Sequence, residues 1–373
     1  MNSDSYYKGD LINGLRNGQG VLYYKNESIQ YKGQFLNDKF EGNGKYYYPD
    51  GSYYIGQFKN GLKHGKGTQY FRNGNKIYEG QFIEGKIDGI GKYNYNDGNY
   101  YIGQFRNNAS NGKGILYYKD GRKIYEGEFL NDKFEGNGKY YDLDGTYYIG
   151  QFKNGLKHGK GTHYFRNGNK IYEGEFIEGL MDGNGKYYYE DGNYYIGQFR
   201  NNGSNGKGIL YYKDGRKIYE GEFLNSKFEG NGKYYYPDGK YYIGQFKNFL
   251  KNGIGVEYES NGKIIYEGGF INNKREGFGK YYNEDGQYYI GEWKSDSTNG
   301  KGVIYYPNGK IKYDGDFVNG KLEGYGKYYE ENGESYFGEL KNSFRHGKGI
   351  IYNQNGSIKY EGEFINGEPK EKI

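Results

Sequence analysis

One five-residue pattern, Tyr-x-Gly-x-Phe, recurs along the whole chain and constrains its fold more than any other feature. Clear copies begin at Tyr31, Tyr54 and Tyr78 and continue, with small variations, to Tyr360, while a degenerate first copy begins at Tyr7. Successive copies begin alternately 24 and 23 residues apart. Such a fixed period is typical of repeat architectures, in which each unit packs against its neighbours.

The repeats divide the chain simply. We expect an N-terminal tail over residues 1–6, a repeat array over residues 7–367, and a C-terminal tail over residues 368–373. Fifteen units are complete and the sixteenth is truncated. The units begin at residues 7, 31, 54, 78, 101, 125, 148, 172, 195, 219, 242, 266, 289, 313, 336 and 360. No linker or change in composition separates them, so a second domain is not expected.

Each unit is predicted to form a β-hairpin. In the unit that begins at Tyr54, alternation with period two places Tyr54, Gly56 and Phe58 on one face of a strand. We expect residues 60–64 to form a polar turn and residues 65–71 to form the returning strand. Asn73-Gly74 then supplies a turn that tolerates positive φ. Glycines inside the strands leave room for aromatic rings to lie over the backbone.

Odd and even units differ, so the larger repeat is a pair of 47 residues. The residue before the Gly-x-Gly motif is acidic in even units, as at Glu41 and Glu135, and is Asn or His in odd units, as at His64 and Asn111. Residues 33–126 match residues 127–220 at 82 of 94 positions. Because the same surface is presented more than once, the sequence favours avidity or repeated docking over a single catalytic pocket.

Composition excludes several classes of site. The 373 residues include 69 Gly and 53 Tyr but no Cys, so disulfides and thiolate metal sites are excluded. Gly65-Lys66-Gly67-Thr68 lacks the spacing and the following helix of a phosphate-binding loop. The histidines form no metal-ligand motif. A net charge of +5, with acidic and basic residues interspersed, gives no argument for nucleic acid. We therefore expect no enzyme activity, cofactor, metal or nucleic-acid partner.

Tyr-x-Gly-x-Phe, then Gly-x-Gly, then Asp-Gly, at this spacing over residues 7–367, resembles the MORN (membrane occupation and recognition nexus) repeat. The resemblance implies an all-β fold: successive hairpins in one elongated, single-layer antiparallel sheet that forms a twisted or curved rod. It also implies partner binding, homodimerisation and roles at cytoskeletal, ciliary or cortical structures. Choline-binding repeats also use Gly-Tyr-rich hairpins, but they rely on tryptophan and export, and this chain has one Trp and no visible secretory signal.

The leading functional hypothesis is a non-enzymatic scaffold. A single-layer sheet is expected to leave its aromatic stripe uncovered, and large exposed apolar patches mark interaction surfaces. The stripe would bind a helix or extended peptide of a protein partner, which the resemblance suggests is cytoskeletal. For any single ring, the alternative is that it packs only against neighbouring hairpins. The predicted partner-binding residues are Tyr54, Phe58, Tyr78, Phe82, Tyr101, Phe105, Tyr125, Phe129, Tyr148, Phe152, Tyr172, Phe176, Tyr195 and Phe199.

The second hypothesis is a peripheral membrane tether that binds anionic phospholipids through basic hairpin turns. Its predicted residues are Lys63, His64, Lys66, Lys157, His158 and Lys160. The acidic turns of even units and the small net charge count against it. Either hypothesis predicts a cytoplasmic protein, associated with the cytoskeleton, a cilium or the inner face of a membrane. MORN arrays also accompany lipid kinase and histone methyltransferase domains, but no residues remain here for either enzyme.

Overall fold

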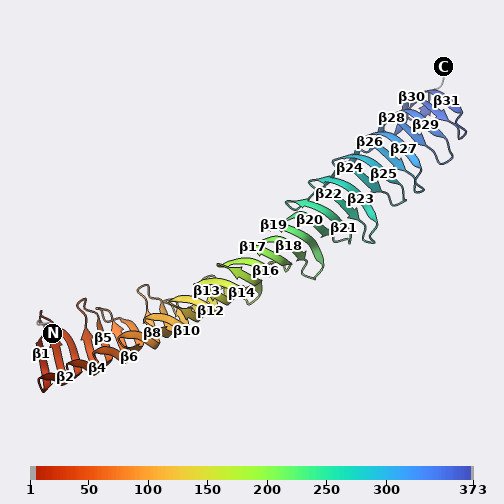
Figure 1. Cartoon of the computed structure of the whole chain (residues 1–373). Coiled ribbons are helices and arrows are strands. Elements are labelled where there is room, and N and C mark those ends of the chain that lie inside the picture. The colour runs from red at the N-terminus through yellow and green to blue at the C-terminus, as the bar shows by residue number, and fades with distance from the viewer. Residues whose placement is uncertain (1–5, 371–373) are drawn as a thin grey trace. The chain divides into compact units, whose positions relative to one another are not determined.

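The computed structural model describes residues 6–370, and all regular structure among them is β-strand. Residues 1–5 and 371–373, which belong to the predicted tails, lie outside the described residues. The chain divides into two compact units, residues 1–187 and 188–373, here called unit 1 and unit 2. Within each unit the strands follow one another in chain order (Figure 1). Residues 6–370 contain no helix long and apolar enough to span a bilayer.

Unit 1 contains the strands from β1 to β16, the last of which ends one residue past the division. They are β1 Tyr6–Ile12, β2 Leu15–Tyr23, β3 Ile29–Leu36, β4 Lys39–Tyr47, β5 Tyr53–Lys59, β6 Leu62–Tyr70, β7 Lys76–Ile83, β8 Lys86–Asn94, β9 Tyr100–Arg106, β10 Ala109–Tyr117, β11 Lys123–Leu130, β12 Lys133–Tyr141, β13 Tyr147–Lys153, β14 Leu156–Tyr164, β15 Lys170–Ile177 and β16 Leu180–Tyr188.

Unit 2 contains the strands from β17 to β32. They are β17 Tyr194–Arg200, β18 Gly203–Tyr211, β19 Lys217–Leu224, β20 Lys227–Tyr235, β21 Tyr241–Lys247, β22 Leu250–Tyr258, β23 Ile264–Ile271, β24 Lys274–Tyr282, β25 Tyr288–Lys294, β26 Ser297–Tyr305, β27 Ile311–Val318, β28 Lys321–Tyr329, β29 Ser335–Lys341, β30 Phe344–Tyr352, β31 Ile358–Ile365 and β32 Glu368–Pro369.

Each unit is an open antiparallel sheet of successive hairpins, as predicted. A strand pairs with the strand before it and the strand after it; β5, for example, pairs with β4 and β6. The substantial contacts of each strand are with these two neighbours, so within residues 6–370 no second layer of secondary structure covers the sheet. The core must therefore be built by side chains on the sheet itself.

The turn inside each hairpin is shorter than the sequence suggested. Lys59 pairs with Leu62, which leaves only Asn60 and Gly61 between the strands, with φ of 52° and 86°. Two residues of positive φ match the type I′ turn, which suits the twist of antiparallel strands. The prediction of a polar turn over residues 60–64 is therefore wrong, because Leu62 already begins β6.

The core is a row of tyrosine rings that lie over paired glycines. Gly56 pairs with Gly67 across β5 and β6. The Tyr54 ring lies over this pair, and its hydroxyl donates a hydrogen bond to the Gln57 carbonyl oxygen at 3.0 Å. Phe82 of the next repeat meets the same ring edge to face, with ring centroids 5.0 Å apart. The prediction that strand glycines make room for aromatic rings is confirmed.

Candidate functional site

The aromatic stripe predicted to bind a partner is already covered within the sheet. Its seven tyrosines are 0% exposed and its seven phenylalanines are 1–6% exposed. Burial raises the pKa of Tyr78 and of Tyr172 to about 12 in each case. These residues are Tyr54, Phe58, Tyr78, Phe82, Tyr101, Phe105, Tyr125, Phe129, Tyr148, Phe152, Tyr172, Phe176, Tyr195 and Phe199. We call the side of the sheet on which they lie the tyrosine face.

The expectation that a single layer leaves this stripe uncovered is wrong. A tyrosine of the stripe typically meets two phenylalanines edge to face, one from its own repeat and one from the next; the Tyr54 centroid is 5.2 Å from Phe58 and 5.0 Å from Phe82. Such edge-to-face contacts are favourable and exclude water from both rings. Partner binding through these rings stays a prediction, but they offer almost no surface for it.

The six residues predicted to contact phospholipid are divided between the two faces. Lys63 and Lys157 lie against the rings of the tyrosine face; the Lys63 Nζ is 5.1 Å from the centroid of Phe82 and 5.6 Å from that of Tyr54. Burial lowers the pKa of both lysines. Lys66 is exposed on the opposite face, where it pairs with Gln81.

The duplicated residues repeat this arrangement. Lys160 is exposed and pairs with Glu175, while His64 and His158 are partly exposed strand residues. These residues therefore lie in strands rather than in turns, because the two-residue loop ends before them. Whether they contact phospholipid remains a prediction, but the structure does not bring these six residues together in basic turns.

The acidic residues that precede Gly-x-Gly in the even-numbered repeats have a structural role that the sequence did not predict. Glu41 Oε2 accepts a hydrogen bond from the backbone N–H of Asn60, which lies in the turn of the following hairpin, at 2.9 Å. Glu135 Oε2 accepts from Asn154 in the same way, also at 2.9 Å. A turn N–H that the ladder cannot reach is thus satisfied by the neighbouring repeat. The carboxylates that counted against phospholipid binding by a basic edge therefore accept hydrogen bonds from the backbone.

The opposite face, which we call the isoleucine face, carries a regular row of paired residues whose isoleucines are exposed. From Ile55 the row passes through Thr68, Glu79 and Lys92 to Ile102, each residue pairing with the next across adjacent strands. From Ile55 to Ile243 one exposed isoleucine therefore recurs every 47 residues, whereas the next member, Ile290, is only partly exposed. In unit 1 these are Ile55, Ile102 and Ile149, at 42%, 41% and 44% exposure. In unit 2 they are Ile196 and Ile243, both at 42%.

The hairpin edge of the sheet carries a second regular row. Beside many of the two-residue turns, an exposed aliphatic side chain pairs with a lysine, as Leu62 does with Lys59 and Ile83 with Lys86. The aliphatic members in unit 1 are about half exposed, between 48% and 51%. The pairs there include Leu36 with Lys39, Leu62 with Lys59, Ile83 with Lys86, Leu130 with Lys133 and Leu156 with Lys153.

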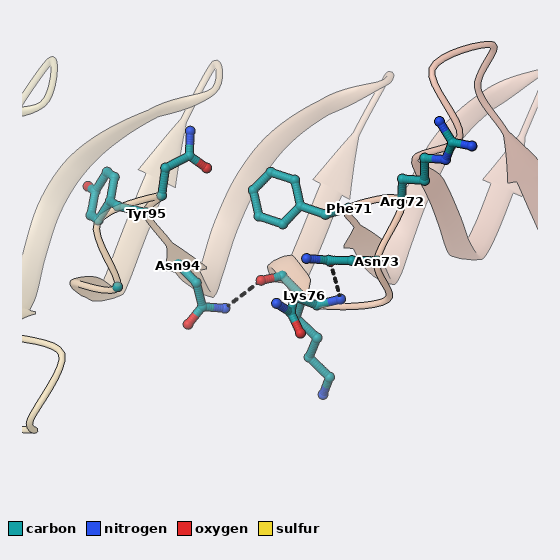
Figure 2. A pocket seen from close by; sticks show the side chains of 9 residues that line it. Phe71, Arg72, Asn73, Lys76, Asn94 and Tyr95 are labelled. Carbon is teal, nitrogen blue, oxygen red and sulfur yellow. Dashed lines mark hydrogen bonds between the residues drawn. The ribbon is translucent and has the colours of Figure 1, made fainter.

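An open hollow of about 700 Å³ lies in unit 1 beside the turns that join neighbouring repeats (Figure 2). The Asn94 amide donates to the Lys76 carbonyl oxygen at 3.1 Å at its edge. Asn94 belongs to the repeat that begins at Tyr78, and the other complete even-numbered repeats have Tyr at this position. The missing tyrosine ring therefore helps to open the hollow. Its lining residues are Phe71, Arg72, Asn73, Asn75, Lys76, Asn94, Tyr95, Asn96 and Gly98. Four of these nine residues are asparagines, whose side-chain amides can donate and accept hydrogen bonds.

No metal centre is built by the part of the chain that the structure describes, since no three His, Asp or Glu side chains gather there closely enough to hold an ion. His163 comes nearest to an acid–base pair. Its Nε2 is 3.7 Å from Asp142 Oδ2, and burial, followed by the Lys157 charge, lowers its pKa.

Comparison with known proteins gives a clear family match. The model described as the MORN repeat matches sixteen segments, which tile residues 7 to 370. They are 7–29, 31–53, 54–76, 78–100, 101–121, 125–147, 148–170, 172–194, 195–215, 219–241, 242–263, 266–288, 289–311, 313–335, 336–358 and 360–370. The comparison with curated proteins returned no match.

Three of the solved structures that match are only weakly similar to this chain. The E1021V mutant of the TCP10 domain of Danio rerio CPAP is 14% identical with a TM-score of 0.22, over 61% of this chain and 95% of that one. A protein of unknown function from Bacteroides caccae is 12% identical with a TM-score of 0.14, over 68% and 90%. The computationally designed Ika8 protein is 10% identical with a TM-score of 0.15, over 86% of each chain. These scores carry no argument about fold or function.

Proposed function

The chain belongs to the MORN repeat family, and from that premise we propose that it is a non-enzymatic scaffold that binds partner proteins along its isoleucine face. The family is one of repeat interaction modules rather than of enzymes. One observation carries the proposal: from Ile55 to Ile243, an exposed isoleucine recurs every 47 residues. The tyrosine stripe, in contrast, is buried.

The chemistry of the isoleucine row suits a protein partner. Between Ile55 and Ile102 lie Glu79 and Lys92, which pair with each other and supply both signs of charge. Apolar contacts would give affinity, while the charges would fix the register of the partner. Ile55 and Ile102 are four strands apart, a distance of about 19 Å. A helix laid across the strands would match them with apolar residues about 13 positions apart.

Repetition makes such binding multivalent. A partner that engages one isoleucine is held near the next, so each further contact forms at high effective concentration. We place this scaffold in the cytoplasm, at a cytoskeletal, ciliary or cortical structure, with a cytoskeletal protein as its partner. A second copy of the chain is a further candidate partner. The proposal does not require an enzymatic step or a cofactor.

A graded series of variants tests this proposal. Ile55, Ile102 and Ile149 are replaced by Lys singly, in pairs and together; Lys92 of the same row shows that the sheet accommodates lysine there. Partners captured by the wild-type chain are quantified against each variant, with Leu143→Lys, at a separate site that is 67% exposed, as the matched control. We expect capture to fall stepwise with each replacement. Full capture by the triple variant would refute the proposal.

A second candidate, contact with an anionic membrane, is favoured by the hairpin edge. Leu62 and Ile83 are each 48% exposed and pair with Lys59 and Lys86. Aliphatic tips could enter the bilayer interface while the lysines approach headgroups, each contributing about 1 kcal/mol near an anionic surface. Flotation with phosphatidylserine vesicles, using Leu62→Ser with Ile83→Ser, tests this. Vesicle binding that is unchanged by the replacement, or that does not weaken as the salt concentration rises, would contradict membrane contact through the hairpin edge.

A further inference from the structure

One place between neighbouring repeats of unit 1 lacks an aromatic ring that the pattern otherwise supplies. The second strand of every other complete repeat ends in Tyr, as β6 does at Tyr70, but β8 ends in Asn94. In an earlier repeat the corresponding Tyr47 lies beside Tyr53 of the next strand, with ring centroids 6.1 Å apart. Asn94 pairs with Tyr100 in the same way but brings no ring. The hollow of about 700 Å³ in Figure 2, here called the asparagine hollow, lies at this place.

Two turns of the same form frame the asparagine hollow. After β6, the Phe71 N–H donates to the Asn75 carbonyl oxygen at 2.9 Å, and the Gly74 N–H donates to the Phe71 carbonyl oxygen at 3.0 Å. After β8, the Tyr95 N–H donates to the Asn99 carbonyl oxygen at 2.9 Å. These backbone donors are already used, so a ligand must be recognised mainly by side chains.

Amides are the commonest side chains in the lining. Asn73, Asn75, Asn94 and Asn96 come from the two turns and from the end of β8. The Asn94 amide donates to the Lys76 carbonyl oxygen at 3.1 Å, which leaves its own oxygen as an acceptor. Asn75 and Asn96 are exposed, and neither side-chain amide forms a hydrogen bond with another residue in the range 6–370. Each amide can both donate to a ligand and accept from it.

The charges of the lining do not favour an ionic ligand. None of its nine residues is acidic, and its two cations are Arg72 and Lys76. The Lys76 Nζ is 2.6 Å from Glu79 Oε2. Arg72 extends away from Asn94, and its stem lies against Gly51 in the preceding turn of this kind (Figure 2). A cation would find no carboxylate among these residues, and an anion would find no free pair of converging positive charges. A neutral ligand therefore suits the lining best.

Two aromatic rings supply the apolar part of the asparagine hollow. Tyr95 is 39% exposed and Phe71 is partly exposed. A purely apolar ligand would contact these rings but leave the amides without partners, which is unfavourable. A sugar carries C–H groups on the faces of its ring and hydroxyls around its rim, and each hydroxyl both donates and accepts. The volume lies within the roughly 300–1,000 Å³ of small-molecule sites.

We propose that the asparagine hollow is a binding site for a neutral saccharide. The C–H groups of the sugar lie against the exposed ring of Tyr95 or Phe71, and its hydroxyls exchange hydrogen bonds with the amides of Asn75, Asn94 and Asn96. This is a binding step in which no covalent bond forms or breaks. The site goes beyond the scaffold function proposed above and does not require the isoleucine row.

The test is saturation-transfer NMR of the full chain with three neutral trisaccharides: maltotriose, cellotriose and triacetylchitotriose. We expect saturation to pass from the chain to at least one of them. Asn94→Tyr supplies the ring that stands in every other complete repeat, so this variant is expected to fold. It should bind the same sugar at least about tenfold more weakly, because the ring fills the hollow. Melting curves of the two proteins check that the fold is retained.

Two further variants separate the contribution of the amides from that of a ring. Asn75→Ala with Asn96→Ala removes two amides that hold no other residue in the range 6–370. Tyr95→Asn removes a ring and copies Asn283, the corresponding residue of a later repeat. Each should also weaken sugar binding at least about tenfold, whereas Leu143→Lys should leave it unchanged.

Several results would overturn the saccharide site. They are the absence of transfer to all three sugars, equal binding by the wild-type chain and Asn94→Tyr, and sugar binding that only the Leu143→Lys variant loses. Partner capture by the Asn94→Tyr variant is measured in parallel and should equal that of the wild-type chain. Loss of sugar binding and loss of partner capture are therefore separate results, and failure of one proposal leaves the other to its own test.

Discussion

The Tyr54 ring occupies the space that a side chain at Gly67 would need. A β-carbon at Gly67 would stand 2.1 Å from the Tyr54 hydroxyl oxygen and 2.4 Å from its ring. Gly61, in the turn of the same hairpin, has a φ of +86° and no atom within 4 Å of its would-be β-carbon. The two glycines are therefore required for different reasons, one for space and one for backbone conformation.

Gly67→Ala is expected to cost about 3 kcal/mol of local stability, because the buried ring must move. Gly61→Ala should cost only about 1 kcal/mol, the usual penalty of a left-handed conformation for alanine. Hydrogen exchange of the β5 and β6 amides measures both losses, since repeat arrays open locally. Equal losses for the two variants would contradict the packing of Tyr54 over Gly67.

Tyr148 separates ring packing from hydrogen bonding. Its hydroxyl donates to the Gln151 carbonyl oxygen at 3.0 Å, and its ring is 0% exposed. Tyr148→Phe should lose about 1 kcal/mol, the contribution of one buried hydrogen bond. Tyr148→Ala should lose about 4 kcal/mol, because the cavity adds to the lost burial. Exchange of the β13 and β14 amides reports both, and a Phe variant as unstable as the Ala variant would contradict the dominance of ring packing.

Glu135 should stabilise the hairpin that follows it. Its carboxylate accepts from the Asn154 N–H at 2.9 Å. Glu135→Ala removes this acceptor, so the Asn154 amide should exchange at least about tenfold faster, which corresponds to about 1.4 kcal/mol. Glu135→Gln retains an acceptor oxygen and should exchange more slowly than the Ala variant. An Asn154 amide whose exchange rate is the same in both variants as in the wild-type chain would show that the carboxylate does not stabilise the turn.

Much of this fold could be predicted from the sequence because the pattern repeats. Alternation gave the strands, Asn73-Gly74 predicted a turn, and the glycine pairs predicted rings over the backbone. The short turn was missed, although Asn60-Gly61 is a type I′ signal, and Leu62 was therefore assigned to a turn.

The site was harder to predict, because a strand pattern places a side chain on a face without saying what covers it. Phe82 of the next repeat packs on Tyr54, and the Glu41 carboxylate accepts a hydrogen bond from the Asn60 N–H of the next hairpin. Both contacts depend on how neighbouring repeats pack. The isoleucine row had a visible signal, since the residues flanking the repeat tyrosine alternate between Tyr-Ile and Ile-Glu.

His163 should make the wild-type chain more sensitive to mild acid. Its pKa in the folded chain is lowered from 6.5, chiefly by burial and then by Lys157. As pH falls below 6.5, the unfolded chain takes up the proton first, so stability is lost until the folded histidine also titrates. His163→Gln, which copies Gln69 of the duplicated segment, should lose less stability between pH 7.5 and pH 5. Melting curves of both proteins that shift in parallel would contradict this.

Photo-crosslinking from the two faces tests the central claim most directly. A benzoylphenylalanine is placed at Ile102, 41% exposed on the isoleucine face, or at Tyr95, 39% exposed beside the rings of the tyrosine face. The chain is then irradiated with its captured partners. We predict partner adducts from position 102 and none from position 95. Adducts from position 95 alone would contradict binding along the isoleucine face and would indicate that the partner binds the tyrosine face.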